Sequence, residues 1–137
     1  MSNLNMLKRQ HSEVLTIIDN IENLIMDGDL DANAKEISSN MNMMAGKLKM
    51  HLMSEDKFLY PNLMKSNRVE VRNIAQTFNN EMGNVSDMFT DFVQKHNTAT
   101  KILQNKESFL MESKKIFKII KDRISKEDCE LYPLLED

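Results

Sequence analysis

The chain has 137 residues, of which 41% are hydrophobic and 28% charged, and its formal net charge is −3. These values predict one globular domain over residues 1–137 that is large enough to bury a hydrophobic core without stabilising cross-links. Basic and acidic residues are mixed, which argues against a nucleic-acid-binding stripe. No apolar run approaches the roughly 18 residues of a membrane span. We therefore expect no nucleic-acid or membrane partner. A single cysteine and a charged N-terminal segment unlike a signal peptide predict a cytoplasmic protein.

Three glycines and two prolines predict a helical chain. Apolar residues recur at steps of three and four in four segments, as on the buried faces of amphipathic helices. The first two stripes are Leu4, Leu7, His11, Val14, Ile18, Ile21, Ile25 and Ile37, Met41, Met44, Leu48, His51, Glu55, Phe58. The other two are Val71, Ala75, Phe78, Met82, Val85, Phe89, Phe92, His96 and Phe109, Ile116, Ile120, Arg123, Glu127, Leu131. Their short connections predict an all-α, up-down-up-down antiparallel four-helix bundle.

The segments that connect the predicted helices contain signals for where the helices begin and end. The second helix is expected to end before Pro61, because proline interrupts helical hydrogen bonding. In the turn that follows, Asn67 and Glu70 have the spacing of an N-cap pair. The polar stretch at residues 97–108 is expected to link the third and fourth helices.

Five ionisable residues interrupt the middle of these stripes, namely His11, His51, Glu55, Arg123 and Glu127. Burying unpaired ionic groups is costly, so these side chains should contact one another or a metal. In an antiparallel helix pair, residues equidistant from the connecting loop lie at similar height. Reflection across the three connections places these five residues and Met82 in one layer.

A repeated motif contains four of these positions. Residues 51–63, HLMSEDKFLYPNL, return 72 residues later as RISKEDCELYPLL at 123–135, and six of the thirteen positions are identical. The two copies differ at their first residue, which is His51 in one and Arg123 in the other.

With His11 in QHSEVL, these motifs make the chain similar to the hemerythrin-like (HHE cation-binding) domain family. The resemblance covers essentially the whole chain. It implies a helical bundle around a non-haem metal centre, which in such domains binds oxygen, senses redox state or iron, or stores metal. Carried over residue by residue, it implies metal ligands at His11, His51, Glu55 and Glu127.

Two positions depart from the family pattern. Met82 stands where the resemblance implies a histidine on the third helix, and Arg123 stands where it implies one on the fourth. Thioether sulfur is a poor ligand for hard or borderline ions, and guanidinium is no ligand. These replaced ligand positions predict at most a mononuclear site. We expect Arg123 to pair with Glu55 and Glu127 as a fixed cation in place of a second ion.

Two hypotheses for the function remain open. In the first, the chain is a cation-binding sensor or regulatory domain with one iron, zinc or manganese ion. In the second, no metal binds, and a degenerate bundle in which Arg123 replaces the metal serves as a protein-interaction module. No catalytic triad, phosphate-binding glycine loop or nucleotide motif indicates an enzyme.

Four further residues have less specific interpretations. His96 is expected at a helix end or on the surface. It lies 14 residues beyond Met82, about 21 Å along a helix axis, so it cannot easily replace the histidine missing at Met82. Tyr60 and Tyr132 are expected at the core edge with hydrogen-bonded hydroxyls. Cys129 is expected to be a buried, inert thiol.

Overall fold

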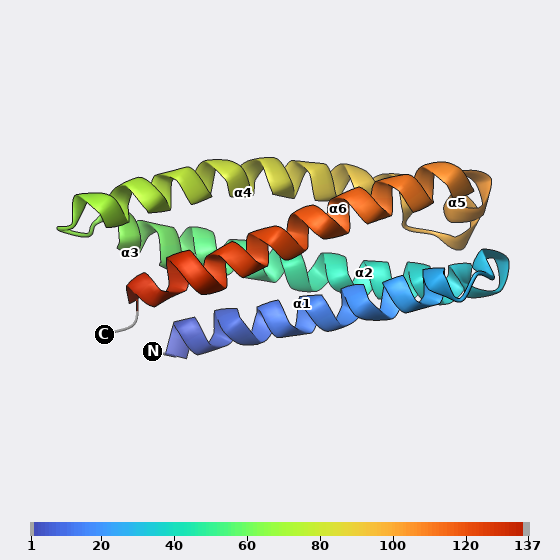
Figure 1. Cartoon of the computed structure of the whole chain (residues 1–137), viewed down its shortest axis with the longest axis horizontal. Coiled ribbons are helices and arrows are strands. Elements are labelled where there is room, and N and C mark those ends of the chain that lie inside the picture. The colour runs from blue at the N-terminus through green and yellow to red at the C-terminus, as the bar shows by residue number, and fades with distance from the viewer. Residues whose placement is uncertain (1, 136–137) are drawn as a thin grey trace.

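The computed structural model describes residues 2–135, and the side chains of residues 2, 3, 56, 82, 83 and 135 lie outside the description. All regular structure in residues 2–135 is helical. The long helices run along the length of the molecule (Figure 1). They are α1 (Ser2–Met26), α2 (Leu30–Ser54), α4 (Val69–His96) and α6 (Lys106–Lys126). The predicted all-α class is therefore confirmed.

The turn between α1 and α2 has a clear local cause. Gly28 adopts a φ of 85°, which glycine reaches without steric cost. The side chain of Asp29 then caps α2 by accepting a hydrogen bond from the Ala32 backbone N–H at 3.1 Å. The chain reverses here, and α2 packs along α1 (Figure 1).

The α-helix α2 ends at Ser54, before Pro61 as predicted, but the helical path does not stop there. A π-helical turn, η1 (Glu55–Leu59), follows α2 directly, and α3 (Tyr60–Met64) continues past the proline. Proline lacks an N–H and crowds the carbonyl four residues earlier. A wider turn before Pro61 relieves that crowding, and the N–H of Tyr60 bonds to the carbonyl of Glu55, five residues back.

A π-helical turn also precedes the proline in the C-terminal copy of the motif. There the π-helical turn η2 (Glu127–Leu131) follows α6 and leads into a 3₁₀ turn, η3 (Tyr132–Leu135). The extra residue in η1 also changes which side chains face inward. Leu59 is buried, whereas Phe58, predicted in the core, is 46% exposed.

The other two connections also differ from expectation. The N-cap of α4 is Arg68 rather than Asn67, and its Nε donates to Glu70 Oε1 at 3.0 Å. The polar stretch at 97–108 contains a short helix, α5 (Ala99–Gln104), whose Ile102 is fully buried. Three apolar residues, Ala99, Ile102 and Leu103, in a polar segment were too weak a signal to predict this helix.

The core consists of two apolar clusters separated by a polar layer. The larger cluster includes Val14, Leu48, Val85, Ile120 and Ile124, and the smaller one includes Leu7, Leu59, Phe78, Leu131 and Tyr132. His11, His51, Glu55 and Glu127 lie between the two clusters along the chain and are buried, and Arg123, also buried, lies at the end of the larger cluster. The predicted layer of ionisable residues is therefore present.

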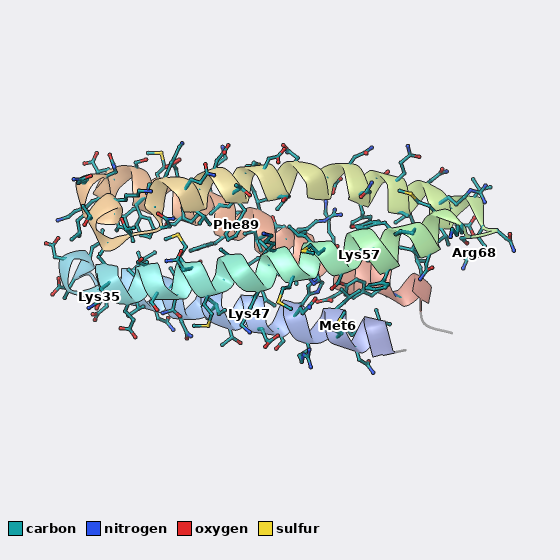
Figure 2. The ribbon with its side chains drawn as sticks, turned by 180° about the vertical axis from the view of Figure 1, so that it is seen from behind. Met6, Lys35, Lys47, Lys57, Arg68 and Phe89 are labelled. Atoms are coloured by element: carbon teal, nitrogen blue, oxygen red, sulfur yellow. The ribbon has the colours of Figure 1, made fainter. Side chains whose placement is uncertain are left out.

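Figure 2 shows the molecule from behind, where Lys35 and Lys47 of α2 and Lys57 of η1 follow one another along the outer face. Phe89, on α4, lies in the larger apolar cluster. None of the helices in residues 2–135 combines the length and apolar character needed to cross a membrane.

Candidate metal centre

Four helical elements bring the four predicted ligand residues together. His11 comes from α1 and His51 from the last turn of α2, while Glu55 and Glu127 are the first residues of η1 and η2. One ligand atom from each residue lies within 4.8 Å of the others. All four side chains are at most 2% exposed. The start of a π-turn at each glutamate is typical of functional positions, because the wider turn redirects the side chains around it.

The distances between these atoms suit ligands of one ion. His11 Nε2 lies 2.9 Å from His51 Nε2 and 2.9 Å from Glu127 Oε1. His51 Nε2 lies 3.3 Å from Glu55 Oε1 and 3.7 Å from Glu127 Oε1. With bonds of about 2.0–2.2 Å, neighbouring ligand atoms on one ion are about 2.8–3.6 Å apart. Three of the four separations fall in this range, and the fourth exceeds it by about 0.1 Å.

Two polar neighbours set the orientation of the imidazoles. His11 Nδ1 donates to Asp128 Oδ1 at 2.9 Å, and His51 Nδ1 donates to the side-chain oxygen of Gln10 at 3.0 Å. With both Nδ1 atoms protonated, the neutral rings direct their Nε2 lone pairs toward each other. Two lone pairs 2.9 Å apart need a cation between them, either a proton or a metal ion.

Burial and mutual contact shift the pKa values of this cluster strongly. Burial alone would lower the pKa of His51, but the nearby carboxylates of Glu127 and Glu55 raise that pKa to about 9. Burial, with the nearby Glu127 carboxylate, raises the pKa of Glu55 to about 8. Burial would also raise the pKa of Glu127, but hydrogen bonds from His11 and His51 lower it. Without metal, the raised pKa values of His51 and Glu55 both favour protonation of the cluster at neutral pH.

Both tyrosines of the repeated motif contribute to the cluster. Tyr60 donates its hydroxyl to Glu127 Oε2, and Tyr132 donates to Glu55 Oε2, each at 3.3 Å. The predicted hydroxyl hydrogen bonds are confirmed, although the rings are fully buried rather than at the core edge. The other oxygen of Glu55, Oε1, is buried without an aligned hydrogen bond, and His51 Nε2 lies 3.3 Å away. Such an oxygen is costly to bury unless a cation, either a protonated imidazole or a metal ion, lies beside it.

Arg123 is buried, as predicted, with 5% exposure. Its expected pairing with Glu55 and Glu127 is wrong. Nη1 instead donates to Glu81 Oε2 of α4 at 2.7 Å, and Nη2 donates to the Tyr60 hydroxyl at 3.1 Å.

Nη2 of Arg123 also donates to the Phe78 carbonyl, and the guanidinium carbon lies 4.2 Å from the Phe78 ring centre. These contacts hold the guanidinium against α4. Arg123 reaches Glu127 only through the Tyr60 hydroxyl. The Arg123 guanidinium therefore lies beside the candidate metal centre and does not pair with the carboxylates of Glu55 and Glu127.

The other predicted residues lie apart from the centre. The Met82 side chain is outside those that the structure describes. His96 ends α4, as expected, but it is buried, and its Nε2 donates to Glu112 Oε2 at 2.8 Å, outside the four-residue cluster. Cys129 is exposed, so its predicted burial is wrong.

Three residues that support the centre were not predicted from the sequence, namely Gln10, Asp128 and Glu81. Gln10 and Asp128 directly adjoin the predicted ligands His11 and Glu127 in the chain. The Glu-Asp pair common to both motif copies was the available signal for Asp128. Glu81 carried no comparable pattern.

Buried imidazoles and carboxylates within an all-helical chain define a protein with a candidate cation-binding centre. The family model described as the hemerythrin HHE cation binding domain matches residues 2–135. The chain therefore belongs to the hemerythrin HHE cation-binding domain family, and the predicted resemblance is confirmed. Comparison with curated proteins and with solved structures found no match in either case.

Proposed function

We propose that the chain binds a single metal ion through His11, His51, Glu55 and Glu127. The observation that carries this proposal is the pair of Nε2 atoms 2.9 Å apart, with both Nδ1 atoms occupied by hydrogen-bond acceptors. Hydrogen bonds from the second ring nitrogen are the usual means by which proteins orient metal-binding histidines. Glu55 Oε1, which is buried without an aligned hydrogen bond, supports the same conclusion.

The donor set favours iron, zinc or manganese. Imidazole nitrogen and carboxylate oxygen suit these borderline and hard ions. A bound iron ion would supply a redox-active Lewis acid in a buried site. The surrounding chain contributes orientation through Gln10 and Asp128 and excludes bulk water through burial of the four ligands.

We propose one ion rather than two because of the residues at the replaced positions. Arg123 carries a permanent positive charge and is held within the same buried layer by Glu81, Tyr60 and Phe78. A second divalent ion beside it would face strong repulsion in a medium of low dielectric constant. Neither guanidinium nor the thioether of Met82 offers a suitable ligand.

We propose a sensing or regulatory role, in which metal occupancy changes how firmly α1 is held. His11 is the link, because its ring contacts Glu127, Asp128 and Tyr132 at the C-terminal end of the chain. An ion shared by His11 and Glu127 would tie the first and last helical segments together. Metal binding adds to the stability of the folded state in proportion to its affinity and concentration.

This proposal includes an arrangement of the whole chain. We propose that residues 1–137 form one domain in which α1, α2, α4 and α6 make the up-down-up-down antiparallel bundle. The successive reversals in Figure 1 support it. A cytoplasmic location stays a prediction from the sequence.

Metal titration of chelator-treated protein tests the proposal. Calorimetry with Fe²⁺ under anaerobic conditions, and with Zn²⁺ and Mn²⁺, should give one ion per chain for at least one of them, with a rise in Tm. His51→Ala should abolish stoichiometric binding. His96→Ala is the matched control, because His96 is equally buried but lies outside the cluster. Equal loss in both variants would contradict a specific role for His51.

The second candidate is a metal-free interaction module. The observation that favours it is the contact of His51 Nε2 with Glu55 Oε1 at 3.3 Å, because the raised pKa of His51, about 9, would let a proton take the place of an ion there. Under this alternative, no ion binds at stoichiometric level and chelation leaves the Tm unchanged. His51→Ala then causes only the ordinary destabilisation of a broken buried network.

A further inference from the structure

The hydroxyl of Tyr132 lies among the candidate ligand atoms themselves. Its oxygen is 3.0 Å from His11 Nε2 and 3.3 Å from Glu55 Oε2. These separations match those of neighbouring ligands on one ion, about 2.8–3.6 Å. The ring is fully buried and stacks on the His11 imidazole, with centres 5.0 Å apart and planes 12° from parallel. Packing therefore fixes the hydroxyl at the ligand cluster.

Tyr60, at the equivalent position of the other motif copy, has a different environment. Its hydroxyl accepts a hydrogen bond from Arg123 Nη2 at 3.1 Å and donates to Glu127 Oε2 at 3.3 Å. Tyr60 therefore already contacts a cation, the Arg123 guanidinium. Tyr132 has no such neighbour among the described residues, and its hydroxyl contacts only His11 and Glu55.

We propose that Tyr132 is a fifth ligand of the centre and that it binds iron in the ferric state as a phenolate. This inference rests on the proposed metal-binding function. On binding, an Fe–O bond replaces the O–H bond, and the hydroxyl proton leaves to solvent. No change in oxidation state is needed when the ion arrives as Fe³⁺.

Charge balance favours a trivalent ion in this arrangement. Two carboxylates and one phenolate supply three negative charges, which equal the charge of Fe³⁺. Nearby charges outside the set have their own partners, since Arg123 binds Glu81 and Asp128 accepts from His11. A neutral assembly avoids the high cost of net charge in a buried site. Phenolate oxygen is also a hard donor that suits Fe³⁺ better than softer ions.

A ferric phenolate has an optical signature, because electron transfer from the ring to Fe³⁺ absorbs visible light. Ferric ions bound only by imidazole and carboxylate lack this phenolate band, and zinc has no such transition. The chain contains two tyrosines and no more. Any tyrosinate band therefore arises from Tyr60 or Tyr132, and substitution of each in turn assigns it.

The test uses full-length, chelator-treated protein titrated with Fe³⁺ supplied as its citrate complex. Iron per chain is measured by elemental analysis after desalting, and the visible spectrum and resonance Raman spectrum are recorded. We expect one iron per chain with a visible band and enhanced tyrosinate ring vibrations. Tyr132→Phe should lose the band, and the matched control Tyr60→Phe should retain it.

The outcomes separate this inference from the proposed function. Iron bound without a tyrosinate signal, a band that persists in Tyr132→Phe, or a band lost in Tyr60→Phe would each overturn the inference alone. The same holds if Fe²⁺ or Zn²⁺ binds stoichiometrically and Fe³⁺ does not. Failure to bind any of the metals would overturn the proposed function as well. Protein labelled with ring-deuterated tyrosine should shift the Raman vibrations in wild type, which keeps the test decisive if Tyr132→Phe does not fold.

Discussion

Arg123 and Glu81 form an ion pair across α6 and α4, with Nη1 and Oε2 2.7 Å apart. The pair turns the buried guanidinium toward α4 and away from Glu55 and Glu127. A metal-free centre in which Arg123 neutralised both central glutamates would have satisfied the layer without an ion. Because Glu81 takes that place, the negative charge of the central carboxylates remains available to a cation, which favours the metal-binding proposal.

Replacing Arg123 should destabilise the fold. Arg123→Met removes the hydrogen bonds to Tyr60 and Phe78 and the contact with Glu81, for a loss of about 2–3 kcal/mol in the free energy of unfolding. Glu81 is half-exposed, so water can solvate its freed carboxylate and limit the loss. Urea denaturation measures the change.

The control for this variant is Lys118→Ala on the same helix. Lys118 pairs with Asp122 on the surface, where such pairs contribute about 0.5 kcal/mol or less. A change in Arg123→Met as small as that of the control would show that the buried guanidinium does not stabilise the polar layer.

Asp128 should act on metal affinity through His11. Asp128→Ala removes the acceptor that holds His11 Nδ1, so the ring can rotate and change tautomer. Loss of such a partner typically costs about 10–100-fold in affinity, and calorimetric titration measures it. Glu130→Ala removes an exposed carboxylate from the same π-turn and should leave the affinity unchanged. Equal affinities in the two variants would refute the orienting role.

The two replaced positions should together control the number of ions. Converting Met82 and Arg123 both to histidine supplies two imidazoles and removes the fixed positive charge. We expect iron content to rise from one to two per chain in the double variant, as measured by elemental analysis. Arg123→His alone is the control and should stay at one. A double variant that remains at or below one iron would show that these positions do not correspond to lost ligands.

Acid should weaken the contact between His96 and Glu112. The hydrogen bond from His96, with smaller effects of Ser108 and Lys95, lowers the pKa of Glu112 from 4.5 to about 2, although burial works in the opposite direction. The folded carboxylate thus binds a proton less readily than the unfolded one. Its contribution is complete above about pH 4.5 and declines as the pH falls toward 2.

Chemical denaturation across this pH range tests the dependence. The difference in unfolding free energy between wild type and Glu112→Gln should shrink from pH 5 toward pH 2. Glu107→Gln, at an exposed position in the first turn of α6, is the control. A Glu112→Gln difference that stays constant with pH would contradict the shifted pKa.

Helical periodicity predicted most of the buried layer correctly. His11, His51, Glu55, Arg123 and Glu127 were all identified from their positions within apolar stripes, and all are buried. This succeeded because a charged residue in such a stripe has few structural alternatives to burial with a partner.

Local backbone chemistry was harder to predict. Pro61 indicated a helix end, yet a π-turn before it lets the helical path continue past it, and the same turn precedes Pro133. The first of these turns places Leu59 in the core, which the period alone does not reveal. The exposure of Phe58 is a direct consequence of the same shift in register.

The partner of Arg123 also lay beyond sequence reasoning. Periodicity placed Arg123 level with Glu55 and four residues from Glu127, so both carboxylates were reasonable partners. The side chain is long enough to reach a different helix, and the Phe78 ring and carbonyl guide it toward α4. Such a choice among nearby acceptors is decided by tertiary packing.

The most direct test of the central claim is the metal content of freshly purified protein produced without an affinity tag. We predict one metal ion per chain by elemental analysis, removed by a chelator with a fall in Tm. Protein that carries no stoichiometric metal and keeps its Tm in chelator would contradict the account, as would two ions per chain.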